Sequence, residues 1–235
     1  IGAVSATAAL LSDRDDLPPQ IGVLESLREL PSGQRLWVNA YTRTQGRPVA
    51  TARGILTSVR DALGEAGLTL DAIVFTGSAG KTCAAACGGD VLNAFRATAG
   101  GLAVLDIDAA SVFEIGGESS NYLHVERNSD GSYGIVDYST NGDCAAGTGS
   151  FIDQQANRLQ YRVEEIGEIC ASADRGAQIA GRCSVFAKSD MIHAQQQGYT
   201  PAEVLRGLCE AIARNFKSSI VKGKKVGKPV LFVGG

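Results

Sequence analysis

The chain has 235 residues, of which 44% are hydrophobic and 20% charged, a composition typical of folded proteins with a buried core. Its formal net charge of -3 argues against a nucleic-acid-binding module held by bulk electrostatics. No apolar run is long enough to span a bilayer and no signal peptide opens the chain, so we expect a cytoplasmic protein without a membrane partner. Ile1 in place of Met, and the glycines Gly234 and Gly235 after a strand pattern, suggest a piece of a longer polypeptide.

Segments of strand type alternate with segments of helix type along the sequence. The run at 121–127 is expected to pair with the run at 133–139 across the turn Asn-Ser-Asp-Gly, as a hairpin. Helix 201–221 begins with the capping pattern of Thr200 and Glu203 and carries one apolar stripe. Further strands are expected at 21–26, 35–41, 72–77, 111–117 and 229–235, and further helices at 48–66, 82–98, 150–160, 163–173 and 184–197.

This mixture predicts an α/β protein whose sheets carry hairpins, in contrast to a pure doubly wound parallel sheet. A seam is expected near 100–110, which divides the chain into a first lobe, 1–108, and a second lobe, 109–235. The motif at 75–82, Phe-Thr-Gly-Ser-Ala-Gly-Lys-Thr, resembles a P-loop. That motif needs a glycine five residues before Gly80, but Phe75 stands there, so we do not predict a P-loop.

Glycine turns at strand ends are the first candidate for a ligand site. In Glu-Ile-Gly-Gly-Glu-Ser-Ser, 114–120, a strand delivers Glu114 and then a turn at Gly116 and Gly117 lets backbone N–H groups approach a phosphate. An ordinary Gly–Gly hairpin is the alternative for this stretch alone. The ending Phe-Val-Gly-Gly at 232–235 and the glycine turn at the start of the chain repeat the pattern. Together they favour a two-lobed ATPase that clamps a nucleotide.

Two of the six cysteines stand out by their surroundings. Cys144 and Cys183 each lie among polar or glycine residues at the mouth of a predicted helix, and they are 183 − 144 = 39 residues apart. That spacing does not fit a zinc knuckle, which needs paired short spacings. An iron–sulfur cubane needs four thiolates, and two chains related by a two-fold axis would supply them. The remaining cysteines are expected to be small buried hydrophobes: Cys83, Cys87, Cys170 and Cys209.

Two alternatives stay open for the cysteines. In one, Cys83 and Cys87 join Cys144 and Cys183 in a cluster within a single chain. In the other, all of them are ordinary buried or surface thiols.

The segments 113–120, 141–156, 181–192 and 230–235 resemble the activators of 2-hydroxyacyl-CoA dehydratases and the ATPase subunits of benzoyl-CoA reductase, the BadF/BadG/BcrA/BcrD family. Cys-Ala-Ala-Gly-Thr-Gly at 144–149 is the specific signature. The resemblance implies an actin-like fold, shared with sugar kinases and heat-shock ATPases and related to ribonuclease H, with ATP or ADP and Mg²⁺ in its cleft. It also implies a homodimer bridged by one 4Fe-4S cluster, ligated by Cys144 and Cys183 of each subunit. The implied activity is ATP-driven, one-electron reduction of a partner acyl-CoA dehydratase or reductase, with ferredoxin or flavodoxin as the electron donor.

Carried onto this sequence, the resemblance gives a set of expected site residues. We expect Glu114 and Glu118 to be the catalytic carboxylates. The expected nucleotide-binding residues are Gly2, Ser5, Gly116, Gly117, Gly147, Thr148, Gly149, Gly234 and Gly235.

Several positions depart from the family pattern. Ala3 replaces the usual serine and Thr7 the usual lysine of the first phosphate loop. Glu118–Ser119 replaces a frequent Gln-Asp pair, and Asn121 replaces a second lysine. Loss of both lysines removes cations that steady phosphates, so slow hydrolysis or a different ligand is expected. Two alternatives to the electron donor follow: a small-molecule kinase of the same fold, and a nucleotide-sensing domain of a larger protein.

Overall fold

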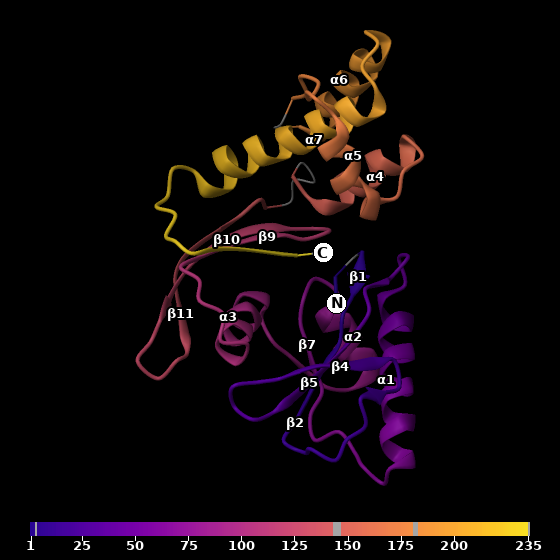
Figure 1. Ribbon diagram of the computed structural model, residues 1–235, viewed down its shortest axis with the longest axis vertical. Coiled ribbons are helices and arrows are strands. Elements are labelled where there is room, and N and C mark those ends of the chain that lie inside the picture. Colours follow the sequence, from indigo (N-terminus) through magenta and orange to yellow (C-terminus); the bar gives the residue numbers. More distant parts are fainter. Residues whose placement is uncertain (3, 143–146, 181–182, 235) are drawn as a thin grey trace. The chain divides into compact units, whose positions relative to one another are not determined.

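The computed structural model describes residues 1–2, 4–142, 147–180 and 183–234. The chain forms two compact units (Figure 1). The first comprises Ile1–Ala109 and Val125–Ile135, and the second comprises Ala110–His124 and Val136–Gly235. The chain passes from the first unit to the second after Ala109, within the range 100–110 in which we expected a seam. The tip of the predicted hairpin, Val125–Ile135, belongs with the first unit.

The first unit contains a four-stranded antiparallel sheet in the order β2-β5-β4-β3. Trp37 of β5 is fully buried beneath it, among apolar side chains of β3, β4 and the long helix of this unit. The four strands are β2 (Ala9–Ser12), β3 (Gln20–Ile21), β4 (Leu24–Glu29) and β5 (Arg35–Asn39). Two short pairs accompany the sheet: β1 (Ser5–Ala6) with β6 (Thr42–Arg43), antiparallel, and β7 (Val74–Phe75) with β8 (Asp90–Val91), parallel.

Helix α1 (Pro48–Glu65) confirms the helix expected at 48–66. Proline in its first turn fixes a helical φ, its apolar stripe is buried, and Gly67 follows its end with a φ of +69°. The prediction of a single helix at 82–98 is wrong. The structure has α2 (Gly80–Cys87), then β8, then α3 (Ala94–Val104). Gly88 and Gly89 have φ angles of +75° and +138°, which a continuous helix does not accommodate.

The second unit has a four-stranded sheet in the order β11-β10-β9-β12. Strand β9 (Ser111–Ile115) pairs antiparallel with β10 (Ser120–Arg127) and parallel with β12 (Val230–Gly234). Strand β11 (Tyr133–Thr140) lies beside β10, so the predicted hairpin is confirmed. The mixed directions of these strands agree with the prediction of an α/β fold whose sheets carry hairpins.

The helices of the second unit gather on one side of this sheet (Figure 1). Helix α7 forms the centre of their core, and its predicted capping box of Thr200 and Glu203 is present. The helix expected at 201–221 is α-helical to Asn215 and continues as a π-helical turn, Phe216–Val221. The helical elements are α4 (Gly149–Arg158), a 3-10 turn (Val163–Glu165), α5 (Ile166–Ser172), α6 (Ser184–Gln196) and α7 (Pro201–Asn215).

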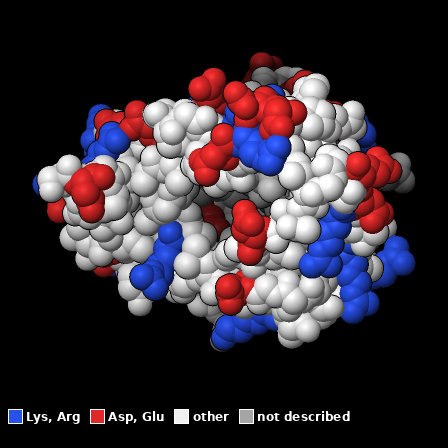
Figure 2. Space-filling model, turned by 90° about the horizontal axis from the view of Figure 1, so that it is seen from below, with Lys and Arg blue, Asp and Glu red and all other residues white. Residues whose placement is uncertain are grey.

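No helix in the described part of the chain is long and apolar enough to cross a membrane. On the face drawn in Figure 2, basic and acidic side chains are interspersed in small groups, so that face carries no continuous basic surface.

Candidate functional site

The predicted glycine turn of the second unit joins β9 to β10. The amide of Gly116 donates to the carbonyl of Ser119 over 2.8 Å, which closes a four-residue turn. Among the described residues, no protein acceptor is found for the amides of Gly117 and Glu118 in this turn. Two successive free amides in a tight turn form a concave donor surface of the kind that binds anions.

The start of α4 is held directly against this turn. The amide of Gly149 donates to the carbonyl of Gly116 over 2.8 Å, and the amide of Ser150 donates to the carbonyl of Gly117 over 2.9 Å. The hydroxyl of Ser150 also donates to the Gly117 carbonyl. A Cβ on Gly149 would lie 3.2 Å from the Gly116 carbonyl oxygen, a tight contact that favours glycine at this position.

The hydrogen bonds of the Gly149 and Ser150 amides limit how the segment 147–149 can bind a ligand. From the sequence we expect free amides at the N-terminus of this helix to hold phosphate, but the first two amides of α4 are already used by the turn. The segment therefore supports the Gly116–Gly117 turn instead of offering a donor at Gly149. Thr148, which precedes the helix, is 1% exposed and so is buried in protein.

The end of β12 packs against the same turn from another direction. Gly234 lies opposite Ile115 in the parallel pair of β12 and β9. A Cβ on Gly234 would lie 2.2 Å from the Ile115 carbonyl oxygen, and the residue has a φ of +120°. The structure thus brings together Gly116, Gly117, Gly149 and Gly234, while Gly235 lies outside the described residues.

Ser120, the residue after the turn, bonds to described residues on both sides of Cys144 in the sequence. Its backbone amide donates to the side chain of Asn141 over 3.0 Å, and its carbonyl accepts from the Asn141 amide over 3.0 Å. Its hydroxyl donates to the carbonyl of Gly147 over 2.6 Å. Cys144 lies between Asn141 and Gly147 in the sequence, outside the described residues. Ser120 therefore fixes the described residues that flank this cysteine, a role that its sequence context alone did not suggest.

The two expected catalytic carboxylates have different surroundings. Glu114 accepts a hydrogen bond from the side-chain amide of Asn121 over 2.7 Å, and Asn121 is 4% exposed. Glu118 lies in the turn and is exposed to solvent. The group that meets Glu114 here is therefore a neutral amide.

The first unit carries a second turn of the same design. The amide of Gly2 donates to the carbonyl of Ser5 over 2.8 Å, the same closing bond as in the Gly116–Ser119 turn. Ser5 then opens β1, opposite Arg43 of β6. Thr7 is exposed, and Ala3 lies outside the described residues.

Cys183 directly precedes the first residue of α6 and is half-buried. The sulfur therefore lies at the N-terminal end of this helix. After Ser184, the side chains of Val185 and Phe186 are each 66% exposed, which is unusual for large apolar groups.

Among the other cysteines, Cys83 is fully buried in the core of the first unit, and burial raises the pKa of its thiol. That setting fits a small buried hydrophobe and disfavours the single-chain cluster through Cys83. No group of three or more metal-ligating side chains occurs among the described residues, which do not include Cys144.

Comparison with known proteins identifies the family. The family model of the BadF/BadG/BcrA/BcrD ATPases matches residues 23–235. The chain belongs to this ATPase family. It is 31% identical over 127 residues to the (R)-2-hydroxyglutaryl-CoA dehydratase activating ATPase of Acidaminococcus fermentans, a match that covers 53% of this chain and 46% of that protein. It is 29% identical over 128 residues to the 2-hydroxyisocaproyl-CoA dehydratase activator of Clostridioides difficile, covering 54% and 46%.

The chain thus aligns with about half the length of these relatives. Two solved structures match the whole of this chain. The A. fermentans dehydratase component A has a TM-score of 0.74 at 21% identity, with 80% of that protein covered. The C. difficile activator with bound ADPNP has a TM-score of 0.72 at 21% identity, with 78% covered. These matches confirm the predicted actin-like ATPase fold.

Proposed function

We propose that this protein is an ATP-dependent, one-electron donor that reduces a partner acyl-CoA dehydratase or reductase. The observation that carries the proposal is the docking of α4 onto the Gly116–Gly117 turn in a chain of this ATPase family. One short segment, 141–149, then connects a phosphate-binding turn with the cysteine of the family signature. A nucleotide site and a redox site on the same segment can affect each other through very few intervening bonds.

Nucleotide binding would use the free amides of the second unit's turn. The amides of Gly117 and Glu118 would donate to phosphate oxygens, and Gly2 and Ser5 would serve the equivalent turn of the first unit. Glu114 and Glu118 are carboxylates near the second turn, and carboxylate oxygens are the side-chain ligands that Mg²⁺ prefers. Their proposed role is to hold the metal, through water, and to orient the water that attacks the terminal phosphate.

The two cysteines, Cys144 and Cys183, suit a cluster that lies on a dimer axis. Cys183 offers a half-buried sulfur at a helix N-terminus, where negative charge is stabilised. With Cys144 it supplies two thiolates, so two subunits supply the four that a 4Fe-4S cluster requires. The cluster, when bound, would accept and pass on a single electron, received from ferredoxin or flavodoxin.

An exposed apolar patch beside Cys183 supports the homodimer. Val185 and Phe186 are each 66% exposed, and Ile192 of the same helix is 42% exposed. Contact of this patch with its own copy across a two-fold axis would remove these side chains from water and bring two copies of Cys183 together.

Ser120 gives the proposed coupling a physical path. Its bonds to Asn141 and Gly147 tie the residues around Cys144 to the strand that begins at the glycine turn. A change in the turn on exchange of ATP for ADP would therefore shift the cysteine segment as well. The turn and the cysteine segment are joined by these hydrogen bonds of Ser120, so the coupling requires no long pathway through the protein.

A second candidate function is a nucleotide sensor with little hydrolysis. The observation that favours it is the partly buried hydrogen bond between Asn121 and Glu114, which places a neutral group where relatives are expected to carry a lysine. Such a protein would bind ATP without turnover. A small-molecule kinase, in contrast, would be a colourless monomer that phosphorylates an alcohol.

Anaerobic purification with iron and sulfide analysis tests the proposal. About four iron and four sulfide per dimer are expected, together with slow ATP hydrolysis. Cys144→Ala and Cys183→Ala should each abolish the cluster, while Cys170→Ala, a change to another half-buried thiol of the same unit, should retain it. Unchanged iron content in both the Cys144 and Cys183 variants would overturn the electron-donor proposal and favour the sensor or the kinase.

A further inference from the structure

Two cysteines outside the candidate site lie in contact in the second unit. The sulfur of Cys170, in the last turn of α5, is 3.8 Å from the sulfur of Cys209 on α7. Both side chains are half-buried, so neither is sealed within the core. Among the described residues, this is the one hydrogen bond that joins two sulfur atoms. The pair is therefore the place in the described chain where sulfur–sulfur chemistry has its reactants already together.

The segment that follows α5 is bound directly to α7. The guanidinium of Arg206 donates to the carbonyl of Ala173, at the end of α5. Four residues later, the amide of Ala177 donates to the carbonyl of Glu203 over 2.9 Å. These bonds hold the backbone of the last turn of α5 beside the middle of α7. The contact between the two sulfurs thus follows from the packing of the two helices and does not depend on one chance side-chain rotamer.

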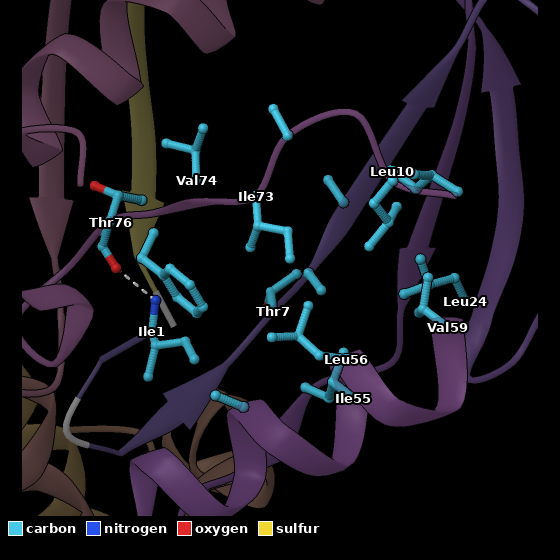
Figure 3. Close-up of a pocket in the computed structure, with 16 residues that line it drawn as sticks. Ile1, Thr7, Leu10, Leu24, Ile55, Leu56, Val59, Ile73, Val74 and Thr76 are labelled. Atoms are coloured by element: carbon cyan, nitrogen blue, oxygen red, sulfur yellow. Dashed lines mark hydrogen bonds between the residues drawn. The ribbon is translucent and has the colours of Figure 1, made fainter. Parts of the chain in front are cut away.

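The first unit contains two further cysteines, whose surroundings differ. Cys83 and Cys87 lie four residues apart on α2, and in the described structure no hydrogen bond joins their sulfurs. Cys83 is fully buried in the same apolar core as Ile1, which lines the cavity drawn in Figure 3. The residues that line this cavity include no cysteine, so a solute that enters it meets no thiol. Half-buried Cys87 is therefore a suitable reference thiol outside the contacting pair.

The two thiols of the pair differ in how readily they lose a proton. Burial raises the pKa of both, and that of Cys209 reaches about 12. At Cys170 the hydrogen bond with Cys209 and the guanidinium of Arg206 act against this effect, whereas Glu210 adds to it. Cys170 therefore provides the larger fraction of thiolate, which is the form that attacks an oxidant.

We propose that Cys170 and Cys209 are a reversible modification site: a peroxide converts them to a disulfide, and a dithiol restores the two thiols. The Cys170 thiolate attacks one oxygen of hydrogen peroxide, so the O–O bond breaks, an S–O bond forms, and the departing hydroxide takes up the thiol proton as water. Cys209 then attacks the Cys170 sulfur, so the S–S bond forms, the S–O bond breaks, and a second water leaves with the Cys209 proton. The pair loses two electrons and two protons, and the peroxide becomes two waters.

The disulfide requires a small approach of the two side chains. A disulfide holds its sulfurs about 2.05 Å apart, so the sulfurs must close a gap of about 1.8 Å. Rotation about the two Cα–Cβ bonds is the motion that brings them together. The dithiol then acts by thiol–disulfide exchange, in which it is itself oxidised to a disulfide.

The bond would tether the segment that carries the exposed apolar patch of α6. The two cysteines are 209 − 170 = 39 residues apart, and α6 lies between them in the sequence. A cross-link over such a loop restricts the unfolded chain and so stabilises the folded one. Neither cysteine is a proposed cluster ligand, so their oxidation is independent of the proposed electron-donor function.

Peptide mapping of the intact protein, first reduced under argon, detects the bond. Trypsin cleaves after Arg and Lys, which places Cys170 in peptide 163–175 and Cys209 in peptide 207–214. After treatment with hydrogen peroxide, these peptides should be linked in most chains, with a mass two hydrogen atoms below their sum. Dithiothreitol should separate them again. The Tm of the treated protein should rise by about 5 °C or more relative to the reduced protein.

Matched variants assign the linkage and its order of steps. Cys170→Ser and Cys209→Ser should each abolish the linked peptides and the gain in Tm, while Cys87→Ser should retain both. In Cys209→Ser the sulfenic acid has no thiol to condense with, so dimedone, a reagent for sulfenic acids, should label Cys170. In Cys170→Ser, Cys209 should stay unlabelled, because its proton is held too tightly for it to attack first.

Three results would overturn the proposal. The first is peptides 163–175 and 207–214 that remain unlinked in the treated wild-type protein while dimedone labels Cys170. The second is a link from Cys170 to a cysteine other than Cys209. The third is a gain in Tm of equal size in Cys170→Ser, because the stabilisation would then come from another oxidised residue.

Discussion

The hydroxyl of Ser120 donates to the carbonyl of Gly147 over 2.6 Å, across the segment that contains Cys144. Ser120 is fully buried and directly follows the glycine turn of the second unit. One side chain therefore connects the phosphate-binding candidate with the cysteine candidate. This relation makes the position a sharper test of coupling than the glycines themselves.

Ser120→Ala should destabilise the protein and release the cysteine segment. The Gly147 carbonyl is buried and loses its partner, at a cost of about 1–3 kcal/mol in the free energy of unfolding. Urea denaturation measures this loss, and alkylation followed by mass spectrometry measures the accessibility of Cys144. Ser139→Ala is the matched control, because the Ser139 hydroxyl donates to the Ile220 carbonyl over the same 2.6 Å in the same unit. Faster alkylation of Cys144 is expected in Ser120→Ala alone, and equal rates in both variants would contradict the coupling.

Gly234→Ala should detach the end of β12 from β9. Any alanine at a positive φ costs about 1 kcal/mol, and here the added Cβ would also lie 2.2 Å from the Ile115 carbonyl oxygen. Gly223→Ala controls for the first effect, since Gly223 has a φ of +74° and nothing within 4 Å of the added Cβ. Thermal unfolding should show a loss for Gly234→Ala at least about 2 kcal/mol larger than for the control. Equal losses would show that the contact is not needed.

Asn121→Lys should strengthen nucleotide binding. A lysine at this position places a cation beside Glu114 and next to the turn whose amides are proposed to hold phosphate. Isothermal titration with ATP and a phosphate-release assay measure affinity and hydrolysis. Asn121→Met adds a side chain of similar reach without charge and should not improve either quantity. An increase in both variants would trace the effect to side-chain size instead of charge.

Cys209 should resist alkylation at neutral pH. Burial, the largest effect, and the neighbouring Cys170, whose sulfur lies 3.8 Å away, raise the pKa of the Cys209 thiol from 9.0 to about 12. The folded protein binds this proton more tightly than the unfolded chain does. The associated stability is thus fully present below pH 9 and is lost as the pH rises towards 12. Iodoacetamide labelling and urea denaturation across this range, with Cys209→Ser as the control, check both statements.

The elements that carry a strong local pattern could be predicted from the sequence. The stripe and capping box of α7, the stripe of α1 and the hairpin of β10 and β11 are all present. The helix expected at 82–98 failed because apolar and alanine residues on both sides hid the break at Gly88 and Gly89. The strand β2 was not predicted, since its short apolar run has no distinctive alternation.

The candidate site was predictable as a set of residues but not as a set of bonds. The glycines of the β9–β10 turn, of the start of α4 and of the end of β12 lie together, as the repeated strand-to-glycine pattern suggested. Which amides remain free depends on the register between segments distant in the sequence, and no local pattern encodes that register. For this reason the use of the Gly149 and Ser150 amides, and the anchoring role of Ser120, came only from the structure.

The edges of β2 and β7, each of which has one neighbouring strand within the described chain, also have a consequence for handling the protein in solution. Unpaired strand edges act as templates for any extended segment nearby. At high concentration, the first unit should therefore be the part of the protein through which molecules self-associate.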